Sequence, residues 1–131
     1  MPQHPYVQGR PLVPVILSRP GHQSIVLIAL VDSGADGCLF DTGIAKAFGL
    51  KKGDRGVRRN SSQGISGGMR TWRWPRGRFS LDFFGTTFPI DPTFADLAVH
   101  GAAFNLLGRA DFFAQFDTVN FDQKNLRVEI R

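Results

Sequence analysis

The sequence predicts an all-β fold, a mostly β domain with one or two short helices, and three observations support this prediction. The chain of 131 residues carries 15 Gly and 8 Pro, well above average usage, which indicates frequent chain reversals. It also contains 12 Phe, and bulky aromatic side chains are enriched in strands. Its apolar runs are short and separated by turn residues, as in a single domain of paired strands.

The first part of the chain predicts two strands followed by a loop. Residues 10–17 predict an early strand that its prolines would keep at a sheet edge, because proline donates no ladder hydrogen bond. After a turn through Pro20 and Gly21, residues 23–31 form a nearly continuous aliphatic run, which predicts a strand buried on both faces. The run ends at residues 32–37, Asp-Ser-Gly-Ala-Asp-Gly, whose residue types tolerate unusual backbone angles and predict a loop.

Between Asp41 and Gly49 the apolar spacing changes to that of a helix. Ile44, Ala47 and Phe48 would share one helix face. Asp41 can cap the start of this helix, and Gly49 suits its C-terminal end.

The rest of the chain predicts further hairpins and a second helical stretch. Residues 63–68 form a glycine-rich tip between segments that could pair, and residues 109–116 carry three Phe at helical spacing. The tail predicts a self-contained hairpin that closes the chain. The remaining strands are expected over residues 79–84, 86–90, 118–121 and 126–130.

Composition excludes several classes of protein. A single cysteine rules out a disulfide framework within the chain, and the three histidines lack metal-ligand spacing, so we expect no metal and no cofactor. The longest apolar run, residues 25–31, is too short to span a bilayer. No signal-peptide pattern is present, so we expect no membrane segment and take the cytoplasm as the default compartment. The net charge of +5 is compatible with an anionic partner but does not require one.

The acidic loop after the buried run is the most informative feature of the sequence. A carboxylate at Asp32 is costly there unless it is hydrogen-bonded or shared. Gly34 allows the backbone to curl so that amides face the carboxylate, and Ser33 adds a hydroxyl. An apolar pair followed by Asp-Ser/Thr-Gly-Ala is the active-site signature of aspartic proteases. The alternative is a turn in which Asp32 and Ser33 only satisfy local amides.

Three further segments accompany this loop: Arg10-Pro11-Leu12-Val13, the glycine-rich tip over residues 64–68, and Leu106-Leu107-Gly108-Arg109. In this order and at these separations, residues 10–116 resemble the retropepsins, the single-domain aspartic proteases typified by the retroviral enzyme. The resemblance implies a retropepsin-like acid-protease fold with one lobe per chain.

The resemblance also implies an aspartic endopeptidase that hydrolyses peptide bonds as a twofold homodimer. Asp32 from each chain would hold the nucleophilic water, and the touching carboxylates would share one proton. Ser33, Gly34 and Ala35 would support the loop, with Ser33 reaching across the twofold axis. Asp41-Thr42-Gly43 offers a second tripeptide of the right form, but it opens the predicted helix and is interpreted as a cap.

By the same resemblance, Asp36 would pair with Arg109, and Arg10 of the other subunit could join them. A mobile flap over the peptide or protein substrate would have the tip Gly64, Ile65, Ser66, Gly67 and Gly68. The sequence departs from the viral pattern at Gly37, where a second acid is common. It also departs in the longer helix and in the tail, because viral dimers interleave their terminal strands.

Two other functions remain open. The fold could serve as a catalytically silent dimerisation or peptide-binding module. A basic nucleic-acid binder could use residues 70–78, which interleave cations with Trp72 and Trp74. We favour a flap stem with a solvated basic face for this segment and do not expect a nucleic-acid partner. Cys38 lacks an evident His partner and is interpreted as a buried structural thiol.

Overall fold

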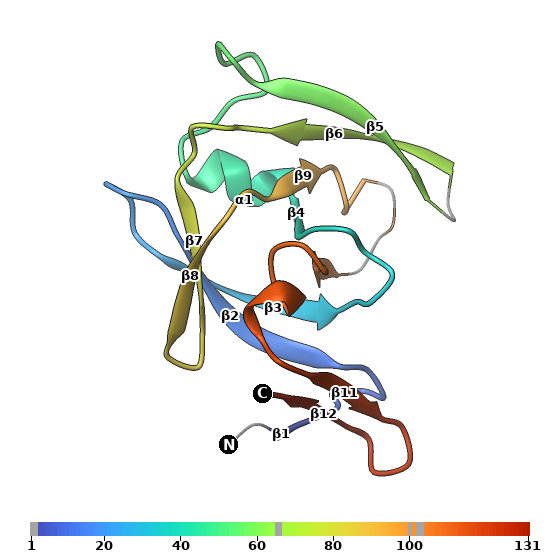
Figure 1. Ribbon diagram of the computed structural model, residues 1–131. Coiled ribbons are helices and arrows are strands. Elements are labelled where there is room, and N and C mark those ends of the chain that lie inside the picture. Colours follow the sequence, from blue (N-terminus) through green and yellow to red (C-terminus); the bar gives the residue numbers. More distant parts are fainter. Residues whose placement is uncertain (1–2, 65–66, 100, 102–103) are drawn as a thin grey trace.

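The computed structural model describes residues 3–64, 67–99, 101 and 104–131 (Figure 1). Within these residues, strands form a nine-stranded and a three-stranded sheet beside one α-helix and one 3-10 turn, so the fold is mostly β as predicted. The elements are β1 (Gln3–Pro5), β2 (Leu12–Ser18), β3 (Ile25–Val31), β4 (Leu39–Asp41), α1 (Thr42–Ala47), β5 (Arg58–Gly64), β6 (Gly67–Arg73), β7 (Phe79–Phe83), β8 (Thr86–Ile90), β9 (Thr93–Ala95), β10 (Asn105–Leu107), η1 (Phe113–Gln115), β11 (Val119–Asp122) and β12 (Arg127–Ile130).

The large sheet has the strand order β5-β6-β9-β4-β10-β3-β2-β7-β8, so β2 lies inside it. The strand itself is confirmed, but the expected edge position is wrong. Pro14 pairs with Ile28 of β3, whereas β7 joins β2 only from Ile16 onward. The proline therefore has a neighbouring strand on one side alone, which satisfies the rule that predicted an edge.

β3 is also a strand as predicted, but only one of its faces is fully buried. Leu27, Ala29 and Val31 point into the core, while Val26 and Ile28 are 68% and 53% exposed. The prediction of burial on both faces is wrong because β3 pairs with the antiparallel β2, and only one side of that pair is covered by the core. An apolar run does not reveal which face stays uncovered.

Helix α1 is capped at both ends by the residues that the sequence singled out. The Asp41 carboxylate accepts a hydrogen bond from the Gly43 N–H at 2.9 Å. At the other end Gly49, with φ of +78°, allows the Leu50 N–H to reach the Ala45 carbonyl at 3.0 Å. The buried face differs from the prediction, because Ala45 is covered and Ala47 is exposed.

The second predicted helix, residues 109–116, is instead an irregular turn that ends in η1. Its aromatic side chains do gather on one side. Phe112 is fully buried and lies 5.2 Å from Phe83 and 5.1 Å from Phe116 between ring centroids. The prediction of a regular helix is wrong because the first turn hydrogen-bonds irregularly, with the N–H groups of both Phe112 and Phe113 donating to the Gly108 carbonyl.

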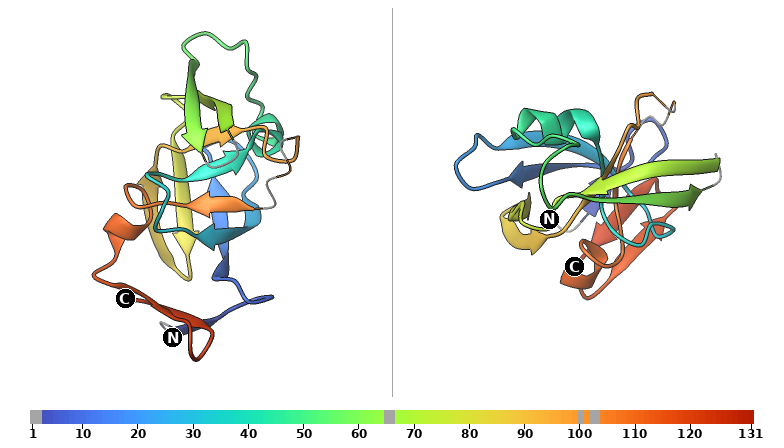
Figure 2. Two further views of the ribbon diagram at one scale, coloured as in Figure 1. Left: turned by 90° about the vertical axis from the view of Figure 1, so that its right-hand side faces the viewer. Right: turned by 90° about the horizontal axis from the view of Figure 1, so that it is seen from above.

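The predicted C-terminal hairpin exists, but it is not self-contained. β1 pairs with β12, so both ends of the chain join one small sheet in the order β1-β12-β11. Figure 2 shows this sheet at the opposite end of the molecule from the β5–β6 hairpin. Among the described residues, no helix is long and apolar enough to cross a membrane.

Candidate active site

Asp32 lies immediately after β3, where neighbouring segments hold its main chain on both sides. β10 runs parallel to β3, and the Asp32 N–H donates to the Leu107 carbonyl at 3.0 Å. On the other side, the Val31 N–H donates to the Pro11 carbonyl at 2.9 Å. The position of Asp32 is therefore set by rigid sheet structure rather than by a flexible loop.

The Asp32 carboxylate has one oxygen engaged and one available. Oδ1 accepts the Gly34 N–H at 2.8 Å, and the Ala35 N–H donates to the Asp32 carbonyl at 3.2 Å to close the turn. No hydrogen bond to Oδ2 forms within the described part of the chain. Asp32 is half-buried, and Ser33 and Gly34 beside it are exposed. This arrangement leaves Asp32 open toward a water molecule or a second carboxylate.

The segment after β10 supports the far half of the loop. The N–H groups of Arg109 and Ala110 donate to the carbonyls of Ala35 and Asp36, at 2.9 and 2.6 Å. The Asp111 carboxylate accepts the Cys38 N–H at 3.1 Å. The sequence-based prediction missed Asp111, although this residue follows the Leu106-Leu107-Gly108-Arg109 motif by only two positions.

Two glycines bring these segments into direct backbone contact. A Cβ at Gly108 would lie 2.2 Å from the Gly37 carbonyl oxygen and 2.4 Å from its carbon. Only a residue without a side chain allows this approach. Gly37, noted in the sequence as a departure from the viral pattern, thus lies against Gly108.

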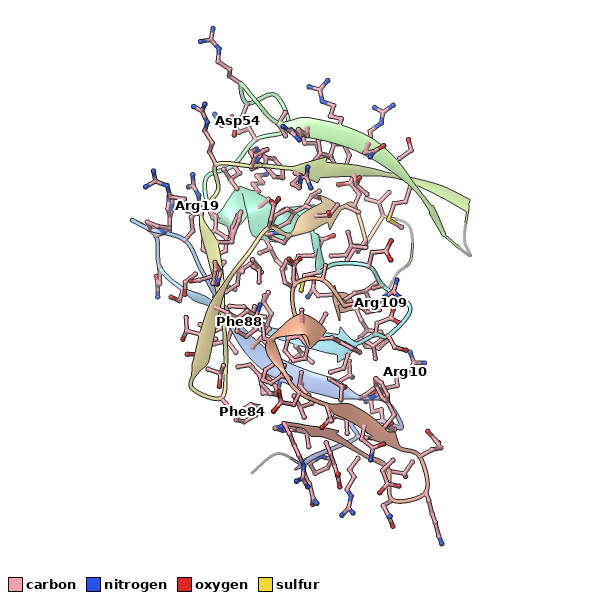
Figure 3. All side chains as sticks on the ribbon, viewed as in Figure 1. Arg10, Arg19, Asp54, Phe84, Phe88 and Arg109 are labelled. Atoms are coloured by element: carbon pink, nitrogen blue, oxygen red, sulfur yellow. The ribbon has the colours of Figure 1, made fainter. Side chains whose placement is uncertain are left out.

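Asp36 and Arg109 form an ion pair, with Arg109 Nη2 donating to Asp36 Oδ1 at 2.5 Å. Both side chains are largely exposed, so the pair by itself adds little stability. Arg10 lies on the same side of the molecule (Figure 3), but within this chain it stacks over Phe104 at 5.0 Å and makes no ion pair with Asp36. Its predicted contact with a second subunit remains a prediction.

Cys38 is almost fully buried under the loop, and burial raises the pKa of its thiol to about 12. We therefore expect the native protein to resist alkylation by iodoacetamide at pH 8, because the reactive thiolate is scarce and covered. The measurement is the alkylation rate by mass spectrometry, with the urea-unfolded chain as the fast control. Equal rates for the two states would show that the loop opens freely.

Asp41 lies away from the loop, in the capping role that the sequence predicted. Its Oδ2 caps α1, and its Oδ1 accepts the Ala98 N–H at 3.3 Å. Asn105, which sequence analysis also missed, ties β4 to β10 by accepting the Asp41 N–H at 3.0 Å. Among the described residues, no group of three His, Cys, Asp or Glu could hold a metal ion.

Comparison with solved structures identifies the architecture. The chain matches the EIAV protease, a retroviral protease solved in complex with the inhibitor HBY-793, with a TM-score of 0.55 and 20% sequence identity. The match covers 79% of this chain and 85% of that protein. The chain has a retropepsin-like fold. No protein-family profile and no curated protein matches it.

In this retropepsin-like fold, the predicted flap tip falls in the β5–β6 hairpin. Gly64 pairs with Gly67, and Gly68 pairs with Gln63, while Ile65 and Ser66 lie outside the described residues. Besides its pairing with β5, β6 is joined to the sheet among the described residues by Thr71 and Trp72, which pair with Ala95 and Phe94 of β9 near the C-terminal end of β6. The tip half of the hairpin projects beyond these pairs (Figure 1).

Trp72 and Trp74 are each only 7% exposed and pack into the core of the retropepsin-like fold. Trp74 lies 5.4 Å from Phe94 between ring centroids, and its Nε1 donates to the Lys51 carbonyl at 3.2 Å. Lys52 Nζ covers the Trp72 ring at 4.1 Å. Neither indole ring is available to stack on a nucleic-acid base.

Three cavities of about 610 to 640 Å³ lie near α1 and the β6–β7 turn, and Asp32 lines none of these three. Ser33 and Gly34 of the Asp32 loop are instead exposed at the surface of the single chain.

Proposed function

We propose that this protein is an aspartic endopeptidase whose active site is completed by Asp32 from two copies of the chain. The observation that carries the proposal is the Asp32 loop. Its carboxylate is oriented by the Gly34 N–H, its main chain is fixed by β10, and its second oxygen is open. The retropepsin-like fold supports a protease architecture, and the roles of the residues rest on this geometry.

The chemistry requires two carboxylates that share one proton. The ionised one takes a proton from water as the water oxygen bonds to the peptide carbonyl carbon, and the protonated one donates to the carbonyl oxygen. Proton return to the nitrogen then releases the amine as the carbon–nitrogen bond breaks. Within one loop, Asp36 is paired with Arg109 and Asp111 holds the Cys38 N–H, so neither supplies the second group.

A twofold-related copy can bring its own Asp32 to the first one. Ser33 is exposed beside Asp32, and in the proposed dimer it contacts the partner loop. Both terminal strands already pair within their own chain, so they do not interleave as in viral dimers. We therefore propose a dimer held mainly through the Asp32 loops and the surfaces beside them.

The direct test is incubation with a mixed peptide library between pH 3 and 8, with products identified by mass spectrometry. Cleavage at defined sites in extended peptides supports the proposal. Peptide binding without turnover at any pH would favour the catalytically silent module instead.

We expect specific activity to fall on dilution, because each chain supplies half of the site. Where monomer predominates, the rate should approach the square of the enzyme concentration. The measurement is the initial rate over a dilution series, with sedimentation velocity at the same concentrations. A monomer whose specific activity stays constant would contradict the shared site.

We also expect a bell-shaped dependence of the cleavage rate on pH, because the pair works with one proton. When both Asp32 carboxyl groups are protonated, no carboxylate remains to act as the base. When both are ionised, no proton remains for the peptide carbonyl oxygen. Because aspartic dyads share one proton in acid solution, we expect the optimum between about 3.5 and 6.5. A rate that rises steadily through pH 8 would implicate a different nucleophile.

A further inference from the structure

Positive charge is concentrated in one quarter of the sequence. Residues 46–78 contain ten of the 16 Lys and Arg residues but only one of the 11 acids, Asp54. Ten cations against one anion give this segment a charge of +9, so the rest of the chain carries −4 of the net +5. The ten are Lys46, Lys51, Lys52, Arg55, Arg58, Arg59, Arg70, Arg73, Arg76 and Arg78.

The fold focuses part of this charge into two adjoining grooves. The first, of about 630 Å³, is lined by Arg19, Arg55, Arg58 and Arg76, and the second, of about 610 Å³, by Arg19, Arg76 and Arg78. Both share the turn at residues 75–77 and are therefore continuous. We call these five arginines the basic surface. Figure 3 shows Arg19 at this end of the molecule, amid other side chains tipped with nitrogen.

Little within the chain neutralises the basic surface. Asp54 lines the first groove and offsets one positive charge there, and its Oδ2 accepts the Lys51 N–H at 2.8 Å and Trp74 Nε1 at 3.2 Å. Arg55, Arg76 and Arg78 are exposed and make no side-chain hydrogen bond or ion pair with any described residue. Their guanidinium groups are therefore available to an anionic partner.

Arg19 contributes rigidity as well as charge. Its Nε donates to the Gly77 carbonyl at 3.1 Å, and its Nη1 donates to the Phe48 carbonyl at 3.0 Å. These bonds tie the β2–β3 turn to the β6–β7 turn and to the end of α1. The grooves thus have a fixed floor, which lowers the entropic cost of binding.

We propose that the basic surface binds the phosphodiester backbone of a nucleic acid without sequence preference. Arginine matches phosphate through paired hydrogen bonds, and nucleic-acid interfaces are more positive and more polar than protein interfaces. Stable protein interfaces and membrane anchors usually include large apolar side chains as well as charge. The large exposed apolar side chains of the described residues all lie outside residues 46–78: Val7, Ile16, Val26, Ile28, Phe84, Val99, Phe121 and Leu126.

Because Trp72 and Trp74 are buried, we expect the basic surface to contact the phosphate backbone and not to stack on bases. The sequence-based alternative relied on Trp72 and Trp74 stacking on bases, and the structure removes that contact. Backbone contact alone follows charge density, which is higher in a duplex than in a single strand. The basic surface should therefore prefer double-stranded DNA to single-stranded DNA of equal length.

The test is fluorescence anisotropy with a labelled 20-base-pair duplex between 50 and 200 mM NaCl. Four or five phosphate contacts give a slope of log K against log salt of about −4, a loss of about 250-fold over this range. Arg55→Gln with Arg76→Gln should make the slope shallower by about 2. Lys124→Gln with Arg131→Gln removes the same charge from exposed residues of the terminal sheet and should change the slope little.

The same binding measurement is made with single-stranded DNA, polyglutamate and phosphatidylserine vesicles as comparison ligands. Weaker binding of all three supports the proposal, as does selective loss in the Arg55/Arg76 variant. Absence of duplex binding at 50 mM salt would overturn it. Equal or tighter binding of polyglutamate or vesicles would overturn it too, and so would equal weakening by both double variants. None of these readouts depends on peptidase activity.

Discussion

We expect Asp32→Asn to abolish peptide cleavage, with a loss of at least about 10³-fold, and to retain the fold and the proposed dimer. The amide is nearly isosteric with the carboxylate, and its oxygen still accepts the Gly34 N–H that orients the loop at 2.8 Å. The amide cannot take a proton from water, and general acid–base catalysis contributes up to about 10⁴-fold. The measurement is the cleavage rate of a peptide from the library, with circular dichroism and sedimentation confirming structure and assembly.

Asp41→Asn is the matched control, because it makes the same change in the other Asp-Ser/Thr-Gly tripeptide. Asn and Asp are about equally good N-caps, so we expect α1 and the cleavage rate to be preserved. Comparable cleavage by Asp32→Asn and the wild type would remove Asp32 from the mechanism. If Asp41→Asn were inactive and Asp32→Asn active, the catalytic carboxylate would be Asp41, and the proposed assignment to Asp32 would be wrong.

We expect Gly108→Ala to destabilise the protein by about 3 kcal/mol or more, the largest effect of any added methyl group. The new Cβ would lie 2.2 Å from the Gly37 carbonyl oxygen and 2.7 Å from the Gly37 Cα. These are backbone atoms, so relief of the clash requires the Asp32 loop or the segment after β10 to move. Urea denaturation measures the loss, and the melting temperature should fall by about 10 °C.

Gly53→Ala provides the control, because a Cβ there meets nothing within 4 Å and its backbone φ is ordinary. Its stability should stay within about 0.5 kcal/mol of the wild type. Faster alkylation of Cys38 in Gly108→Ala would place the damage in the loop, since this thiol lies directly beneath it. Wild-type stability in Gly108→Ala would show that the two segments separate at no cost.

Local sequence patterns predicted most helices and strands. They failed where the conformation or burial of a segment depends on contacts with residues far away in the chain. The Asp41 cap and the Gly49 stop of α1 were correct, because both depend on bonds within a few residues. The exposed face of β3 was not predicted, since the covering layer comes from distant segments. Residues 109–116 have helical spacing, but irregular hydrogen bonds to the Gly108 carbonyl replace a regular helix.

The candidate site divides in the same way. Asp32 and Gly34 are two residues apart, so their hydrogen bond follows from the local sequence. Asp111 and Cys38 are 73 residues apart, and only the folded chain brings them together. The contact between Gly37 and Gly108 is also long-range. The need for glycine at position 108 could not be predicted from the sequence, because it arises from the Gly37 backbone lying against it.

The β-rich character, the acidic loop after an aliphatic strand and the capped helix follow from the sequence alone, because backbone preferences and short-range hydrogen bonds produce these features. Three other features appear only in the folded chain: the pairing of β1 with the C-terminal hairpin, the burial of Trp72 and Trp74, and the groove that Arg19 and Arg76 share. These outcomes depend on long-range packing, in which the energy of each contact depends on segments far away in the chain. Charge and aromatic content can be counted from the sequence, but the surface on which they lie is a property of the fold.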